Sequence, residues 1–221
     1  MYTWTRGRLL ARLGAIEFEY DCQGRRTRKI TNGSVPHEYF YDGDKLIAEI
    51  YNRVTLYFFY DESGVCGMRC NGANYEFVRN IFGDVIRIYD DNGDLKASYT
   101  YDAWGNHKVY NPDGTENTNT AFIGNINPIR YRGYYYDSES GLYYLMSRYY
   151  DPSIGQFISP DTSDYLAPDT IGGVDLYAYC NNNPIMYVDP TGHFSGLIFQ
   201  PIAFISSRIS SSKIEAIAIP I

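Results

Sequence analysis

A tyrosine-aspartate pair recurs along the first half of the chain, and this repeat constrains the fold more than any other feature. The five copies read EYDCQG, FYDGDKL, FYDESG, IYDDNG and TYDAWG, with aspartates at positions 21, 42, 61, 90 and 102. In four copies a glycine follows the aspartate by three residues. The first intervals are 21 and 19 residues, and the next two, 29 and 12, together span about two repeats. A degenerate period near 20 residues indicates a stack of similar units.

Each repeat has the composition of a β-hairpin. Aromatic and β-branched residues precede the pair, as in VTLYFFYD and DVIRIYD, and are typical of strands. The aspartate can accept backbone N–H bonds, and the glycine can adopt the positive φ that a tight turn needs. Because a lone hairpin is only marginally stable in water, the hairpins should share one continuous sheet. The sequence therefore predicts an all-β fold, an elongated and twisted sheet of hairpins.

Composition agrees with this prediction and argues against some functions. The 221 residues include 24 tyrosines, 20 glycines and 10 prolines, which suit half-buried strands joined by turns. The apolar fraction of 44% indicates a globular chain rather than a disordered one. A nucleic-acid-binding surface is usually basic, so the net charge of −7 argues against nucleic acid as a partner.

The cysteines indicate neither a disulfide scaffold nor a metal site. Cys22, Cys66, Cys70 and Cys180 form no CxxC motif and have no histidine cluster near them, so zinc is not expected. We interpret them as four free, half-buried thiols, with a Cys66–Cys70 disulfide as the alternative. We expect no metal and no cofactor.

No targeting or membrane segment is evident in the chain. The N-terminal apolar stretch is short and is interrupted by Arg8 and Arg12, so it does not have the form of a signal peptide. No run approaches the roughly 20 apolar residues of a membrane helix. The nearest, FSGLIFQPIAFISS, is broken by Gln200 and Pro201. We therefore expect no membrane span.

One stretch of the second half, RYYDPSIGQFISPDT at 148–162, mixes charge, turn residues and aromatic residues. We expect Tyr149, Tyr150, Phe157 and Ile158 to pack inward while Pro152 and Gly155 turn the chain. This would hold Arg148 and Asp161 at the base of the turn.

These motifs resemble a known family. The Tyr-Asp pairs resemble the YD repeats of the RHS family. The stretch RYRGYYYDSESGLYYLMSRYYDPSIGQFISPDT, followed by DLYAYCNNNPIMYVDPTGH, resembles its RHS repeat-associated core. The match is close over 130–193 and looser over 15–108.

The resemblance implies a hollow β-shell of YD repeats, closed at one end by a core that in many members is an aspartyl autoprotease. Matched residue by residue, its arginine is Arg148 and its two aspartates are Asp161 and Asp189. The implied cut falls between His193 and Phe194, where relatives carry leucine in place of the histidine. The implied product is a variable C-terminal toxin held within the shell.

The same chemistry can be argued from the residues alone. Amide hydrolysis by carboxylates needs two of them at one site, one protonated and one ionised, which charge repulsion and desolvation can arrange. A nearby arginine could orient the pair or stabilise an oxyanion. The alternative is that both aspartates only form turns, since SPDTSD and VDPTG are good turn sequences.

Other acidic and histidine residues fit structural roles better. Asp137 and Glu139 suit a hairpin turn, and His37 and His107 fall in the repeat turns, where we expect them to be solvated. We find no Ser-His-Asp spacing, phosphate-binding glycine loop or metal-ligand cluster in the sequence.

We divide the chain into a YD-repeat hairpin array (1–108), the RHS core (109–193) and a short variable tail (194–221). The tail is too short for an ordinary enzyme domain, and the chain is expected to be a fragment of a longer parent that is secreted or displayed at the cell surface.

Three functions remain open. The first is a self-cleaving shell and core. Its partners would be its own tail or a toxin cargo, together with an immunity protein or a secretion apparatus. The second is a non-catalytic structural module that binds cell-wall carbohydrate through exposed tyrosines. The third is a degenerate toxin remnant.

Overall fold

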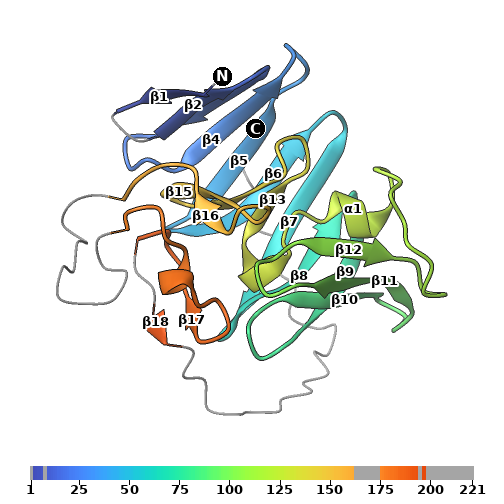
Figure 1. Cartoon of the computed structure of the whole chain (residues 1–221). Helices are drawn as coiled ribbons and strands as arrows, with labels where there is room; N and C mark the ends of the chain where they lie inside the picture. The colour runs from blue at the N-terminus through green and yellow to red at the C-terminus, as the bar shows by residue number, and fades with distance from the viewer. Residues whose placement is uncertain (1, 7–8, 162–174, 194–195, 198–221) are drawn as a thin grey trace.

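One antiparallel sheet of twelve strands makes up the first half of the chain in the computed structural model, which describes residues 2–6, 9–161, 175–193 and 196–197. Each strand pairs with its neighbours in sequence, and Figure 1 shows the sheet twisting from β1 to β12. The predicted all-β fold of hairpins in a twisted sheet is thus confirmed. The strands are β1 (Tyr2–Thr5), β2 (Leu9–Leu13), β3 (Ile16–Tyr20), β4 (Arg26–Thr31), β5 (His37–Asp42), β6 (Lys45–Tyr51), β7 (Val54–Asp61), β8 (Gly64–Cys70), β9 (Ala73–Arg79), β10 (Val85–Asp90), β11 (Leu95–Tyr101) and β12 (His107–Tyr110).

The repeat turns use the aspartate side chain as the sequence predicts. Oδ1 of Asp21 accepts the N–H groups two and four residues later, each at 2.9 Å, and Asp102 does the same. Asn80 makes this turn between β9 and β10, accepting two N–H groups at 3.0 Å. In a meander, successive turns lie at opposite ends of the strands, so the turn at Asp90 lies at the end opposite to the other four Tyr-Asp turns. When Asn80 is counted in place of Asp90, the turns at one end of the sheet are spaced by 21, 19, 19 and 22 residues.

A β-bulge accompanies four of the five Tyr-Asp tyrosines. The register of the hairpin shifts immediately before Tyr20, Tyr41, Tyr60 and Tyr89. A bulge bends its strand and increases the local right-handed twist. The repeated bulge next to the turn therefore contributes to the twist of the whole sheet.

Three of the five Tyr-Asp tyrosines also form a hydrogen bond from one hairpin to the preceding hairpin. The hydroxyls of Tyr20, Tyr60 and Tyr101 donate to backbone carbonyls 10, 14 and 16 residues earlier, at 2.8, 3.0 and 2.7 Å. A tyrosine suits this position because its ring packs half-buried while its hydroxyl finds a polar partner.

A second, smaller antiparallel sheet lies against one face of the large sheet (Figure 1). Its strands pair in sequence order, and a separate two-stranded pair follows. The elements are α1 (Ile123–Ile126), the 3-10 helix η1 (Tyr131–Gly133), β13 (Tyr135–Asp137), β14 (Leu142–Leu145), β15 (Arg148–Asp151), β16 (Gln156–Phe157), the 3-10 helix η3 (Cys180–Asn182), β17 (Tyr187–Val188) and β18 (Gly196–Leu197).

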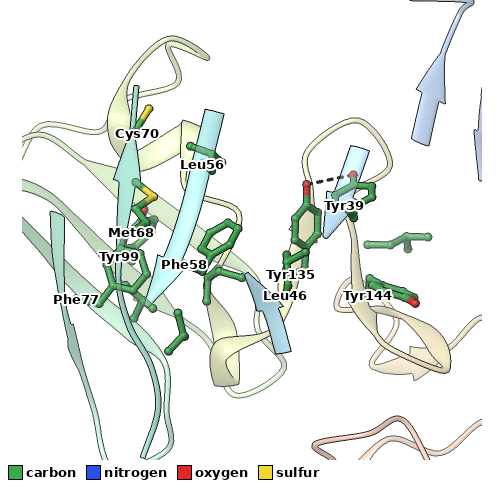
Figure 2. Close-up of a cluster of buried hydrophobic side chains, with 14 of the residues drawn as sticks. Tyr39, Leu46, Leu56, Phe58, Met68, Cys70, Phe77, Tyr99, Tyr135 and Tyr144 are labelled. Atoms are coloured by element: carbon green, nitrogen blue, oxygen red, sulfur yellow. Dashed lines mark hydrogen bonds between the residues drawn. The ribbon is translucent and has the colours of Figure 1, made fainter. Parts of the chain in front are cut away.

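The main hydrophobic core lies between the two sheets. Alternating residues of the large sheet, among them Leu56, Phe58 and Met68, are buried together with Tyr135 and Tyr144 of the small sheet. Figure 2 shows these side chains, including Tyr39 and Tyr135, whose hydroxyls lie 3.3 Å apart across the interface.

A cluster of buried charges crosses the same interface, and we call it the inter-sheet ion cluster. Arg26 and Lys29 of β4 both bind the carboxylate of Asp137 of β13; the Lys29 Nζ–Asp137 Oδ1 distance is 2.8 Å. Lys29 also binds Glu139 at 2.8 Å. The exposed fractions of Arg26, Lys29 and Asp137 are 0%, 1% and 1%, so these charges are sealed from water. The guanidinium of Arg26 also lies 4.4 Å from the ring centroid of Tyr39.

This arrangement corrects the expectation for both histidines. His37 begins β5 and is half-buried, with Nδ1 2.6 Å from Glu49 Oε1. His107 begins β12, and its Nδ1 lies 3.1 Å from the hydroxyl of Tyr143. Burial and the charge of Arg130 lower the pKa of His107 to about 3. Neither histidine is a solvated turn residue, because the second sheet covers the ends of both strands.

Other expectations can be compared directly with the described residues. All four cysteines are free, so the Cys66–Cys70 disulfide is absent, but only Cys66 is half-buried as expected, since Cys22 is exposed and Cys70 and Cys180 are buried. Most tyrosines are not at the surface: ten are buried, and only Tyr2 and Tyr177 are exposed among those described. No helix in the described ranges is long and apolar enough to cross a bilayer.

Removing the acid of the inter-sheet ion cluster should destabilise the fold strongly. Burial alone raises the pKa of Asp137, but the charges of Arg26 and Lys29 outweigh it and hold that pKa below its ordinary value. Asp137→Asn removes the carboxylate that pairs with buried Arg26 and leaves Lys29 with Glu139 alone, and it should cost about 3–5 kcal/mol in urea unfolding. Asp61→Asn, which breaks a half-exposed pair with Arg79, should cost about 1 kcal/mol or less.

The cost of Asp137→Asn should also depend on pH. Because the folded pKa of Asp137 is depressed, its stabilisation is complete above the ordinary aspartate pKa of about 3.9 and is lost as pH falls below it. The stability difference between wild type and Asp137→Asn should therefore shrink in acid. Equal costs for the two variants at neutral pH would contradict a structural role for the cluster.

Candidate active site

Arg148 is the centre of the candidate site and is placed by the second sheet. It is the first residue of β15, directly after the tight turn that joins β14 to β15, where Met146 has a positive φ of 61°. Its strand neighbours Tyr149 and Tyr150 are 2% and 0% exposed. The guanidinium carbon lies 3.6 Å from the ring centroid of Phe157 on β16. The arginine is thus held by a buried strand and covered by an aromatic ring.

Asp189 heads a compact turn that its own side chain closes. Its Oδ1 accepts the N–H groups of Thr191, Gly192 and His193 at 3.3, 2.7 and 3.1 Å. Gly192 has a φ of 77°, which other residues adopt only with strain. The Gly192 carbonyl accepts from Nε of Arg148. The turn therefore docks its backbone directly on the central arginine.

Asp161 reaches the same arginine from the segment that follows β16. Its Oδ2 lies 2.9 Å from Arg148 Nη2, and Asp189 Oδ2 lies 3.6 Å from the same nitrogen. The other oxygen of Asp161, Oδ1, lies 2.8 Å from Nδ1 of His193. Two carboxylates distant in sequence thus meet at one buried guanidinium, with His193 beside them.

The two carboxylates have different surroundings. Burial raises the pKa of Asp189, and the lowering effects of Arg148 and of three backbone N–H groups do not cancel that rise. Each oxygen of Asp161 has its own partner, with Arg148 at Oδ2 and His193 at Oδ1. A buried carboxyl with a raised pKa, placed beside a second carboxylate on the same arginine, is the arrangement that acid–base catalysis by two carboxyl groups needs.

The candidate site residues predicted from the sequence lie together, as far as the structure describes them. Arg148, Asp161, Asp189 and His193 form one cluster, and Phe194 lies outside the described residues. As expected, Tyr149, Tyr150 and Phe157 are buried, Ile158 is partly buried, and Gly155 turns the chain with a φ of 69°. In the described ranges no three histidine, cysteine or acidic residues are grouped to hold a metal ion.

Three supporting residues were not foreseen. The hydroxyl of Tyr134 donates to the Asp189 carbonyl at 2.8 Å, and that of Ser147 donates to the Thr191 carbonyl at 2.7 Å. The Leu176 carbonyl accepts from Arg148 Nη1 at 3.0 Å and from the Asp161 N–H at 2.9 Å. Tyr134 stands in a run of three tyrosines, so no signal in the sequence distinguishes it. Ser147 could have been suspected from its place beside Arg148.

Comparison with known proteins identifies the family of the chain. Residues 5–185 match the Teneurin YD-shell family. The chain belongs to this family. The RHS/YD-repeat resemblance noted in the sequence is thereby confirmed, and the match runs from the first hairpins into the segment after β16.

The relatives are much longer proteins. The chain is 43% identical over 186 residues to the tRNA3(Ser)-specific nuclease WapA of Bacillus spizizenii, a match that covers 82% of this chain and 8% of that protein. The crystal structure of TcdB2-TccC3-Cdc42 superposes with a TM-score of 0.66 at 22% identity, over 86% of this chain and 10% of that one. The Photorhabdus luminescens Tc holotoxin pore gives 0.61 at 19% identity, over 93% and 10%. The two solved structures therefore show a shared fold.

The turn at Gly192 gives a sharp structural test of the site. A Cβ there would lie 2.6 Å from Ser147 Oγ and 2.8 Å from the Leu145 carbonyl oxygen. Gly192→Ala should therefore combine left-handed strain of about 1–2 kcal/mol with an overpacking cost of about 1–3 kcal/mol.

Gly93→Ala is the matched control, because Gly93 has a φ of 80° but a Cβ added there would have no neighbouring atom within 4 Å. Chemical denaturation of both variants should show Gly192→Ala losing more stability, by about 1–3 kcal/mol. Equal losses would mean that the turn is not seated on the β14–β15 connection.

Proposed function

We propose that this chain is the end of an RHS/YD-repeat shell whose core cuts its own backbone after His193 and releases the C-terminal segment. The observation that carries the proposal is the pair of carboxylates on one buried arginine. Asp161 and Asp189 contact the same nitrogen of Arg148, and the Asp189 turn leads directly to the bond in question. The reaction is hydrolysis of a peptide bond within the same chain.

The roles follow from the surroundings of each group. Asp161, held by Arg148, takes a proton from water, and the water oxygen adds to the carbonyl carbon of His193. Asp189, whose pKa is raised by burial, gives its proton to the carbonyl oxygen. The C–N bond then breaks as the nitrogen takes the proton from Asp161, and the oxygen returns its proton to Asp189. The products are a carboxyl group on His193 and an amino group on Phe194.

Arg148 would hold the two acids in register rather than exchange protons. Its guanidinium cannot lose a proton in a protein, and it donates to the Gly192 carbonyl and forms ion pairs with both carboxylates. It therefore fixes the backbone one residue before the cut. Intramolecular positioning of this kind replaces the binding step of an ordinary protease.

The partner of the core would be the released segment itself. We propose that the 28 residues after His193 occupy the position at which longer relatives carry an effector domain. The nuclease for which WapA is named is an example of such an effector. An immunity protein, a secretion apparatus and a secreted or surface location belong to the same proposal. The alternative of carbohydrate binding through exposed tyrosines is not favoured by the described surface, since ten tyrosines are buried.

Intact-mass measurement of the purified chain tests the cleavage. We expect a break between His193 and Phe194 in the wild type. Asp161→Asn and Asp189→Asn should each slow the break by at least about a hundredfold, since each removes one side of acid–base catalysis.

Asp151→Asn is the control for a nearby aspartate that only shapes a turn, where Oδ1 accepts the Ser153 N–H at 2.9 Å. This variant should be cut like the wild type. A wild-type chain that stays whole, or an Asp161→Asn chain that is cut at the normal rate, would refute the proposal.

A further inference from the structure

His193 contacts both carboxylates of the candidate site, and through different groups. Its main-chain N–H donates to Asp189 Oδ1 at 3.1 Å, and its imidazole Nδ1 lies 2.8 Å from Asp161 Oδ1. The main-chain contact is available to any residue at this position. The imidazole contact is specific to histidine and engages the carboxylate that would act as the base.

The imidazole and Arg148 occupy opposite oxygens of Asp161. Arg148 Nη2 lies 2.9 Å from Oδ2, and the ring of His193 takes Oδ1. Among the described residues, Asp161 is a charged group in direct contact with the ring, Arg148 and Asp189 lie next to it in the same cluster, and the side chain of His193 is 17% exposed. The ring can therefore exchange protons with solvent while it remains bound to Asp161.

The state of the ring changes what Asp161 can do. A neutral ring with hydrogen on Nδ1 donates one ordinary hydrogen bond to the carboxylate. A protonated ring places a second full positive charge against it, and an opposite charge at this range lowers the basicity of a carboxylate. Imidazole is the side chain whose charge ordinarily changes between pH 5 and 8.

We propose that His193 is a positioning residue that makes self-cleavage pH-dependent: its imidazole holds Asp161 and, once protonated, weakens Asp161 as the base. This inference rests on the proposed self-cleavage and adds its regulation. The residue at the cut thus controls the carboxylate that would cut beside it. Cleavage is fast when the ring is neutral and slow when it is charged.

The test compares wild type with His193→Asn and His193→Leu. The asparagine amide can still donate to Asp161 but does not titrate, and leucine can do neither. Full chains made by cell-free synthesis are exchanged into buffers from pH 5.5 to 8, and the fraction cut is followed by intact mass. Dividing the wild-type rate by the His193→Asn rate at each pH cancels ionisations that both chains share, including that of Asp189.

We expect this ratio to fall about tenfold from pH 8 to 5.5, a change that a neighbouring charge can produce. The His193→Leu and His193→Asn profiles should be parallel. A constant ratio, with the wild type cut, overturns the inference and leaves the proposed function intact. A wild-type chain that stays whole at every pH overturns both.

A second measurement does not depend on cleavage. In the uncut Asp189→Asn chain, the ring nitrogen resonances of His193 should change when Asp161→Asn is added and should not change when Asp151→Asn is added. Unchanged resonances in the first case would show that the imidazole does not contact Asp161 in solution, and would overturn the inference.

Discussion

The contact between Asp137 and the two cations of β4 fixes how the two sheets sit together. Hydrophobic contacts between sheets tolerate small slides, but a carboxylate shared by buried Arg26 and Lys29 does not, because a displaced charge would remain in a dry interface. Asp137 ends β13, which pairs with β14, and β14 pairs with β15. The position of Arg148, the first residue of β15, therefore depends on an ion pair in another part of the molecule.

The site combines strand β15 with two segments that have less regular secondary structure. Arg148 belongs to a sheet, and Asp189 belongs to a turn that its own carboxylate closes. Asp161 follows β16 and is tied by its N–H to the Leu176 carbonyl, which Arg148 also binds. Arg148 thus binds two less regular segments. It contacts the Asp189–His193 turn through the Gly192 carbonyl and the segment after β16 through the Asp161 carboxylate. This order suits the proposed self-cleavage, in which the substrate is part of the same chain.

The local features could be predicted from the sequence, and the long-range ones could not. Hairpins and Asp-x-x-Gly turns depend on residues close in sequence, so the all-β sheet was foreseen. The turn at Asn80 was missed because asparagine supplies the same oxygen without the Tyr-Asp signature. The inter-sheet ion cluster joins residues more than 100 positions apart, and nothing near Arg26 or Lys29 marks them as buried. The candidate aspartates were found by family resemblance, since their turn sequences alone are ordinary.

The two interpretations of Asp189, turn former and acid, turn out to be compatible. Asp113 is an exposed turn former, and its bonds to the Thr115 hydroxyl and N–H lower its pKa. Asp189 makes the same kind of bond, with three N–H groups on Oδ1, yet its pKa is raised because it is buried. Its Oδ2 stays directed at Arg148. Burial, rather than the turn motif, therefore separates Asp189 from Asp113, and it raises the pKa of Asp189 because Arg148 does not outweigh it as Arg26 and Lys29 do at buried Asp137.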